Sequence, residues 1–257
     1  MSQLDYHKRP EWSYSAMKKI LDSGIDYAAG ARQGLIPGPD SVYIDIGQLV
    51  HQTILGGDEV FVISEFPDFR TKAAREWRDE QKAAGRIIVT EDMANAVSEM
   101  VKNIRNHPHS EKYLTGVGIK HEQEMFARTD EGIELRGKAD ANKLINGEAL
   151  IITDIKTTAQ FDKFVRDAFW RHYDLQSAVY TLIAASHMKV STELVNYYFC
   201  VVETVAPYRV QYFHASLEFV ESGERKLRTC IDAIVEFGDK QPSFLIEDIK
   251  ELGDYSL

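Results

Sequence analysis

The stretch from Leu150 to Thr158 constrains the fold of this chain more than any other. It opens on Leu-Ile-Ile-Thr, a run of mostly β-branched residues that predicts a short buried strand. Asp154 and Lys156 follow two positions apart, so both lie on one face of the strand, with Ile155 on the other. Buried charges of this kind need to pair with each other or to bind a metal ion. The stretch therefore predicts a strand whose end carries a functional site.

Further carboxylates are expected beside this strand end. From Ile119 the hydrophobic pattern alternates with a period of two, and turn residues interrupt it twice. The pattern predicts three consecutive antiparallel strands, over residues 121–128, 133–144 and 150–158. Glu122 lies on the first strand and Asp140 on the second. The strands therefore bring Glu122, Asp140 and Asp154 towards one another.

Helical periodicity of about 3.6 residues surrounds these strands. Helices are predicted over residues 13–23, 40–55, 71–85, 91–106, 161–173, 174–187 and 216–237, further strands over 59–64, 193–202 and 208–214, and a loop over 30–39. We expect a single α/β domain over 1–257, with a helical part to about 115, a core over about 116–237 and a short irregular tail. The predicted architecture is a mixed sheet flanked by helices.

Charge and composition restrict the class of protein. A net charge of −10 argues mildly against nucleic acid and fits an acidic enzyme with a small substrate, but net charge does not reveal a local basic channel. The apolar runs are too short to span a membrane and no signal-type segment precedes them, so we expect a cytoplasmic protein. Cys200 and Cys230 are predicted to be reduced core thiols, too few for an iron–sulfur cluster.

The acidic residues suit a hard divalent cation. Mg²⁺ typically binds one or two carboxylates together with water and substrate phosphate. Asp140 and Asp154 can supply the carboxylates, the Ile155 carbonyl a neutral ligand, and Glu122 can complete the shell. Lys156 can orient a water molecule or neutralise a developing anion. The pattern suits metal-dependent phosphodiester hydrolysis.

Three further motifs allow two interpretations each. His51 lies on the apolar face of its predicted helix, and taken alone it fits a core histidine better than a ligand. His107-Pro108-His109 resembles a metal motif, but its proline favours a turn. Asp248-Ile249-Lys250 repeats the Asp-x-Lys pattern without an upstream hairpin aspartate, so we interpret it as a coincidence.

In combination, these motifs resemble a known family. Their order is Gly47-Gln48-Leu49-Val50-His51, Glu122-Gln123-Glu124-Met125-Phe126, Gly137-Lys138-Ala139-Asp140, Asp154-Ile155-Lys156-Thr157 and Gln176-x-x-x-Tyr180. This order is similar to the PD-(D/E)xK nucleases, which have a restriction-endonuclease-like core. Within them it looks closest to the RecE-type (exodeoxyribonuclease VIII) and lambda-exonuclease-like branch of phages and prophages. Ala139 stands where many members have proline.

The resemblance implies roles for individual residues. It makes His51 a metal ligand beside Asp140, Asp154 and the family glutamate, Glu122, with Glu124 as the alternative. Lys156 is the catalytic lysine. Gln176 and Tyr180 would lie near DNA or the scissile phosphate. In the charged helix predicted over residues 71–85, Lys72 and Arg75 are candidates for phosphate contacts.

The resemblance also implies an activity. We expect a Mg²⁺- or Mn²⁺-dependent exonuclease, with one or two ions per site, that digests linear duplex DNA 5′→3′. The 3′ single strand would pass to a single-strand annealing protein, and a homo-oligomeric ring would enclose the DNA. The alternatives are a structure-specific or nicking endonuclease on the same core, and a degenerate member that binds DNA or a partner without cutting.

Overall fold

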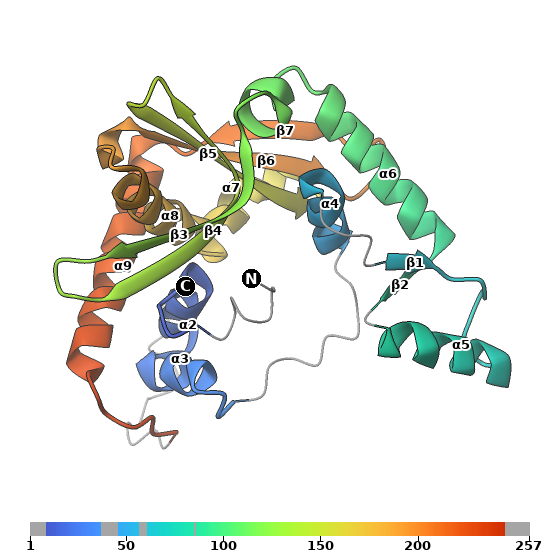
Figure 1. The fold of residues 1–257 in the computed structure, drawn as a ribbon, viewed down its shortest axis with the longest axis horizontal. Helices are drawn as coiled ribbons and strands as arrows, with labels where there is room; N and C mark the ends of the chain where they lie inside the picture. Colours follow the sequence, from blue (N-terminus) through green and yellow to red (C-terminus); the bar gives the residue numbers. More distant parts are fainter. Residues whose placement is uncertain (1–8, 37–45, 57–60, 85, 245–257) are drawn as a thin grey trace.

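The structure is a computed structural model that describes residues 9–36, 46–56, 61–84 and 86–244. A five-stranded mixed sheet forms its centre, in the order β3-β4-β5-β6-β7 (Figure 1). These strands are β3 (Lys120–Arg128), β4 (Glu134–Ile145), β5 (Ala149–Thr158), β6 (Val195–Glu203) and β7 (Val210–His214). All neighbours are antiparallel except β5 and β6, which are parallel and are connected through two helices. The predicted run of three antiparallel strands is confirmed.

Helices cover both faces of this sheet. They are α2 (Tyr14–Ser23), α3 (Ile25–Arg32), α4 (Ile46–Leu55), α5 (Lys72–Ala83), α6 (Glu91–Asn106), α7 (Phe161–Trp170), α8 (Tyr173–Met188) and α9 (Leu217–Phe237), with a π-helical turn at Glu111–Thr115 and a 3-10 turn at Thr192–Leu194. The hydroxyls of Ser13, Thr71, Thr90 and Ser216 cap four helices by accepting backbone N–H bonds. No helix among the described residues is long and apolar enough to cross a bilayer.

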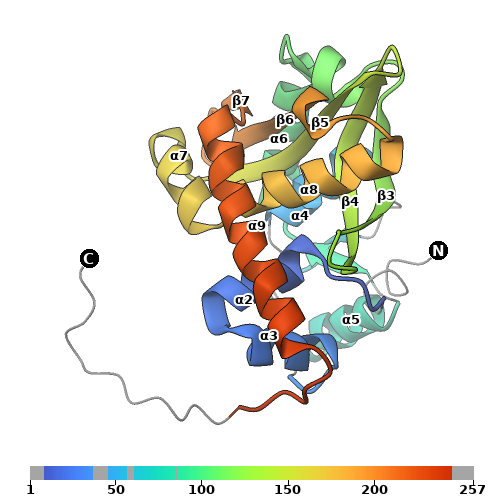
Figure 2. The ribbon, with the colours of Figure 1, turned by 90° about the vertical axis from the view of Figure 1, so that its left-hand side faces the viewer.

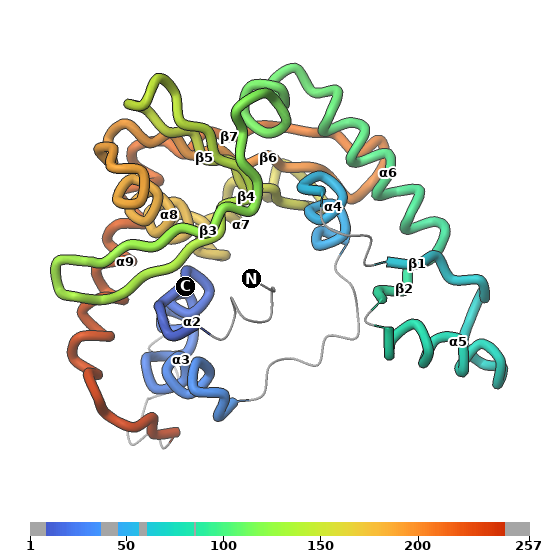
Figure 3. Tube along the Cα trace, in the orientation of Figure 1, coloured from blue at the N-terminus to red at the C-terminus, as the bar shows by residue number. Residues whose placement is uncertain are grey.

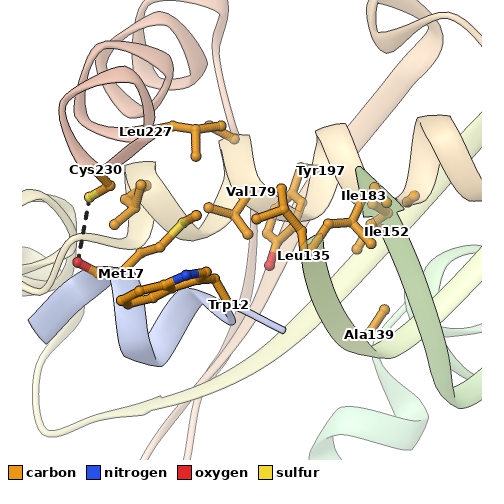
Figure 4. Close-up of a cluster of buried hydrophobic side chains, with 14 of the residues drawn as sticks. Trp12, Met17, Leu135, Ala139, Ile152, Val179, Ile183, Tyr197, Leu227 and Cys230 are labelled. Atoms are coloured by element: carbon orange, nitrogen blue, oxygen red, sulfur yellow. Dashed lines mark hydrogen bonds between the residues drawn. The ribbon is translucent and has the colours of Figure 1, made fainter. Parts of the chain in front are cut away.

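Two hydrophobic clusters lie on either side of the sheet. Helix α8 packs directly on β3, β4 and β6, and α9 covers α8 (Figure 2). Their cluster includes Met17, Leu135, Ile152, Val179 and Tyr197 (Figure 4). The second cluster lies under α4 and α6 and includes Leu49, Val50, Met100, Ile104 and Cys200. Burial of each large side chain contributes about 1.5–3 kcal/mol, so both helical layers are fixed on the strands that carry the acidic residues.

The β3–β4 hairpin extends past β5 and lies beside α2 (Figure 3). The chain before α2 joins β4: the Trp12 backbone N–H donates to Glu134 O (2.8 Å), and Arg136 N–H donates to Trp12 O (2.9 Å). The indole of Trp12 is buried in the same cluster as Leu135. The N-terminal helices are therefore part of the sheet's core.

Some sequence-based boundaries were wrong. The loop predicted from Gly30 begins later, because α3 follows α2 after Gly24, whose φ of 87° is available to glycine, and buries Ala28 and Ala29. The predicted 161–173 helix ends at Trp170, where His172 takes a left-handed φ of 58°. The short parallel pair β1 (Phe61–Ile63) and β2 (Ile87–Val89) was only half predicted. The helix start predicted at Asp40 lies outside the described residues.

Candidate active site

The strand register lines up three carboxylates. Glu122 lies opposite Asp140 in the β3–β4 pair, since the flanking residues pair as His121↔Ala141 and Gln123↔Ala139. The β4–β5 pairing ends at Ala141↔Thr153, so Asp140 and Asp154 are the next residues along the two strands. Turn lengths and hydrophobic alternation set this register. Three adjacent strands thus bring Glu122, Asp140 and Asp154 into one row.

Where β4 and β5 separate, the side chain of Asp140 takes the place of a backbone carbonyl as hydrogen-bond acceptor. The Ile155 backbone N–H donates to Asp140 Oδ2 at 2.8 Å instead of to a carbonyl of β4. The N–H and C=O of one strand residue point to the same side. The Ile155 carbonyl therefore faces the gap beside Asp140, while its side chain is buried in the α4–α6 cluster.

Glu122 has an unusual backbone conformation. Its φ of 52° lies in the left-handed region, although it stands inside β3. Such a conformation costs about 1–3 kcal/mol in a non-glycine residue and is concentrated at functional sites. One carboxylate oxygen contacts the Lys138 ammonium, and the other, Oε1, is buried without a hydrogen-bond partner. The strain and the unpartnered oxygen both favour a role for Glu122 beyond packing.

Helix α4 carries His51 to the two acids of β3 and β4. Leu49, Val50 and Ile54 anchor the helix in the second cluster, against the sheet, and His51 lies at the border of this buried face with its side chain 30% exposed. Its Nε2 lies 2.8 Å from Asp140 Oδ1 and 3.6 Å from Glu122 Oε1. The ligand atoms of His51, Glu122 and Asp140 all lie within 4.8 Å of one another. His51 therefore lies beside the carboxylates, half-buried, and is not enclosed among apolar core residues.

The charges in this group depend on one another. Burial lowers the pKa of His51, but its hydrogen bond to Asp140 and the nearby carboxylates outweigh that effect and raise it overall. Burial raises the pKa of Asp140, but the bond to His51 and the charge of Lys156 outweigh it, so that this pKa is lowered. The arrangement keeps Asp140 ionised, as a metal ligand must be.

Asp154 and Lys156 form a second, adjoining group. The Lys156 Nζ lies 2.5 Å from Asp154 Oδ2 and 4.7 Å from the centre of the Tyr173 ring. The other oxygen, Oδ1, accepts a 2.7 Å bond from the side-chain amide of Gln176 on α8. Asp154 thus has a hydrogen bond on Oδ1 and an ion-pair contact, without a hydrogen bond, on the buried Oδ2, and it lies outside the group whose ligand atoms are within 4.8 Å.

Burial controls the ionisation of this pair. Asp154 is only 5% exposed, and burial raises its pKa to about 6, although the charge of Lys156 opposes the rise. Burial lowers the pKa of Lys156, but Asp154 outweighs it and the pKa is raised overall. Lys156 therefore stays charged at neutral pH while fixed against a carboxylate and an aromatic face.

The remaining predicted residues lie at different places. Tyr180 donates from its hydroxyl to Lys138 O (3.2 Å), at the edge of the site. Glu124 is opposite Lys138 and outside the His51 group, so Glu122 fits the family glutamate better. Lys72 and Arg75 lie on exposed α5; Lys72 pairs with Glu76 at 3.7 Å, and neither makes a hydrogen bond or ion pair with the acidic residues.

Two residues of the site were missed by the sequence interpretation. Lys138 contacts Glu122, and the ring of Tyr173 lies beside Lys156. Lys138 was detectable, because it stands two positions before Asp140 and shares its strand face. Tyr173 was not, since only the packing of α8 places it there. The pair Cys200 and Cys230 are buried free thiols, one in each cluster, as predicted.

The mixed sheet flanked by helices, with two acids and a lysine at the adjoining positions of β4 and β5, defines a PD-(D/E)xK fold. The chain matches the PDDEXK-like domain of unknown function (DUF3799) over residues 13–243, and it belongs to this family. The comparison with curated proteins gives no match.

Solved structures agree on the fold. A crystal structure described as that of a "Putative exonuclease" from Eubacterium rectale aligns with a TM-score of 0.56 and 15% identity, over 96% of this chain and 93% of that chain. At this identity the likeness concerns the fold alone. The structure of SSO0001 aligns with a TM-score of 0.31 and 13% identity, over 72% of this chain and 86% of that chain, and this score is too low to indicate a common fold.

Proposed function

We propose that this protein is a divalent-metal-dependent nuclease that hydrolyses phosphodiester bonds of DNA. The observation that carries the proposal is the meeting of His51, Glu122 and Asp140 within 4.8 Å, next to a largely buried lysine. Membership of a PDDEXK-like family supports the same chemistry. An ordinary structural ion-pair cluster would not need a strained glutamate with an unpartnered buried oxygen.

The donor set fits Mg²⁺ or Mn²⁺. Carboxylate oxygens and one imidazole nitrogen suit these ions, and the free Oε1 of Glu122 offers a ready ligand atom. We assign His51, Glu122 and Asp140 to the metal, with Asp154 and the Ile155 carbonyl as the remaining ligands and one or two ions per site. When bound, such an ion lowers the pKa of a water molecule and stabilises charge on a phosphoryl oxygen.

Lys156 is the proposed catalytic lysine. Its ammonium can orient the attacking water or neutralise the phosphorane-like charge, and a largely buried position strengthens that interaction. Asp154 and the Tyr173 ring hold the ammonium in place. Gln176, through its bond to Asp154 Oδ1, fixes the carboxylate that positions the lysine. We therefore assign Gln176 a positioning role beside the scissile phosphate.

The proposed substrate is linear double-stranded DNA, digested from its ends. The motif order resembles the RecE-type and lambda-exonuclease-like branch, which supports 5′→3′ digestion, a 3′ single-stranded product for recombination, a ring-shaped oligomer and an annealing-protein partner. The Eubacterium rectale protein of the same fold is itself described as a "Putative exonuclease". We propose Lys72, Arg75 and Tyr180 as additional DNA contacts.

Two substrates test this function. Linear duplex labelled at its 5′ or 3′ ends should be shortened in Mg²⁺, with mononucleotide release from the 5′ ends, whereas covalently closed circles should stay intact. Cutting of the circles would contradict the assignment as an exonuclease and would support an endonuclease. Calorimetric titration with Mn²⁺ should show binding to the wild-type protein and about 10- to 100-fold weaker binding to His51→Ala, by analogy with the loss of other metal-site groups. Absence of both hydrolysis and metal binding would leave only a DNA-binding role.

A further inference from the structure

A polar cavity lies beside Lys156, lined by Thr157, the next residue of the strand, and by Tyr173, whose ring the lysine contacts. Its volume is about 500 Å³, and it lies between the end of β5 and helix α7. Thr157 and Thr158, the residues after Lys156, form one wall, and α7 forms the other. A strand whose phosphate reached Lys156 would therefore have this cavity as its next contact surface.

The helical wall of the cavity is basic. Lys163 and Arg171 both line it, both are exposed, and neither makes an ion pair among the described residues. Asp167 is the one acid among the described lining residues, and Arg166 neutralises it through an Nη2–Oδ1 contact of 3.1 Å. The wall thus presents two unpaired cations in a chain of net charge −10. Such a local excess of positive charge suits phosphate groups.

An exposed tryptophan on the same helix directly precedes Arg171 in the sequence, although it does not itself line the cavity. Trp170 is 78% exposed, while Phe164 and Ala168 of the same helix are buried. It follows Lys163 by seven residues, about two helical turns, so these two side chains point in nearly the same direction, and Arg171 lies about 100° further round the helix. An aromatic ring next to phosphate-binding cations is the arrangement used to hold unpaired bases.

We propose that Lys163, Trp170 and Arg171, the α7 stripe, bind a single-stranded DNA segment next to the scissile phosphate. Lys163 and Arg171 contact phosphates, and an unpaired base stacks on the Trp170 indole. Stacking requires a base that is free of its partner strand, so the stripe selects single-stranded or tailed DNA over blunt duplex. The inference rests on the proposed nuclease function, because that function brings a DNA strand to Lys156.

Binding without catalysis tests the stripe. We would measure the anisotropy of a fluorescein-labelled single-stranded oligonucleotide in EDTA, which prevents metal-dependent hydrolysis. Trp170→Ala should raise Kd about 5- to 150-fold, since stacking of one base contributes about 1–3 kcal/mol. Lys163→Ala/Arg171→Ala should weaken binding and reduce the slope of log K against log salt by about 1.4, or about 0.7 for each phosphate contact. Arg225→Ala/Lys240→Ala, which removes two exposed charges outside the cavity, should bind like wild type.

Intrinsic tryptophan fluorescence gives a second measurement of binding, whose predicted result a misfolded variant would not produce. DNA should quench the tryptophan emission of the wild-type protein, and Trp170→Phe should bind DNA but lose most of the quenching. Trp12 is buried and Trp77 packs between Phe66 and Phe69, so both should report little change.

Two results would overturn the inference. One is unchanged oligonucleotide affinity in the folded Trp170→Ala and Lys163→Ala/Arg171→Ala variants. The other is an equal loss of affinity for blunt duplex in Trp170→Ala, because a duplex end offers the stripe no free base. Failure of the nuclease proposal would look different: the wild-type protein would not hydrolyse DNA in Mg²⁺, whatever its affinity for the oligonucleotide in EDTA.

Discussion

Gln176 on α8 donates a 2.7 Å hydrogen bond to Asp154 on β5, so a helix from one side of the sheet fixes the carboxylate that holds Lys156. Both residues are buried, at 4% and 5% exposure. A buried carboxylate that loses such a donor keeps its desolvation cost without compensation. The relationship explains why a residue that does not reach the metal group can still control the lysine.

Two substitutions of Gln176 should therefore impair hydrolysis to different degrees. Gln176→Ala should lower kcat about 10- to 100-fold with little change in KM, as for other residues that orient site groups. Gln176→Glu should be worse, because a second carboxylate beside Asp154 raises the pKa of both groups. Steady-state kinetics on linear duplex would check the order. Wild-type activity of the folded Gln176→Ala variant would show that the bond is not used.

Glu122 offers a test of stored strain. Glu122→Ala and Glu122→Gly both remove the carboxylate, and both should lose metal affinity and activity. Only glycine adopts a φ of 52° without strain. Glu122→Gly should therefore be more stable than Glu122→Ala by about 1 kcal/mol, or about 2–4 °C in Tm for a chain of this size. Thermal unfolding in EDTA would measure the difference, and a less stable glycine variant would contradict the strain argument.

Glu203 anchors the start of α7. It accepts the Phe161 backbone N–H at 3.3 Å and two bonds from Arg209, at 2.6 and 2.7 Å. The bond from Arg209 holds the pKa of this carboxyl below its ordinary value of 4.5, against the effect of burial. A lowered carboxyl pKa stabilises the fold above the unfolded-state value, and that stability is lost as the pH falls through the folded-state value.

Glu203→Gln should consequently be less stable than wild type at neutral pH, but not at acidic pH. At pH 7 we expect a Tm about 2–4 °C below wild type, for a loss of about 1 kcal/mol. The gap should stay constant down to about pH 4.5 and narrow below it. Glu193→Gln, at an exposed position, is the matched control. A gap that widens on acidification would contradict the assignment of this ion pair.

The sequence predicted the elements of the site better than their contacts. Alternation placed Glu122, Asp140 and Asp154 on consecutive strands, because a hairpin register follows from local turns. His51 could not be assigned from its helix alone, since the same apolar face fits a core residue, and only the family resemblance favoured a ligand. The left-handed φ of Glu122 and the Gln176–Asp154 bond have no sequence pattern, because they arise where separate elements meet.

The α7 stripe was overlooked for a related reason. Lys163, Trp170 and Arg171 look like a solvated helix face, and only the position of α7 against the end of β5 places Lys163 and Arg171 in one cavity, with the exposed Trp170 on the same helix. The break between α7 and α8 was predicted after Tyr173, whereas the chain leaves the helical conformation at His172, so α7 ends at Trp170 and α8 begins at Tyr173.

The most direct test of the central claim compares the two Asp-x-Lys copies. Lys156→Ala should abolish hydrolysis of end-labelled linear duplex in Mg²⁺ while circular dichroism stays native, and Asp154→Ala should do the same. Asp248→Ala/Lys250→Ala changes the same residue types at the second copy and should keep full activity. Digestion by wild type and the second-copy variant, with none by Lys156→Ala, is the predicted result. Full activity of a folded Lys156→Ala protein would contradict the account.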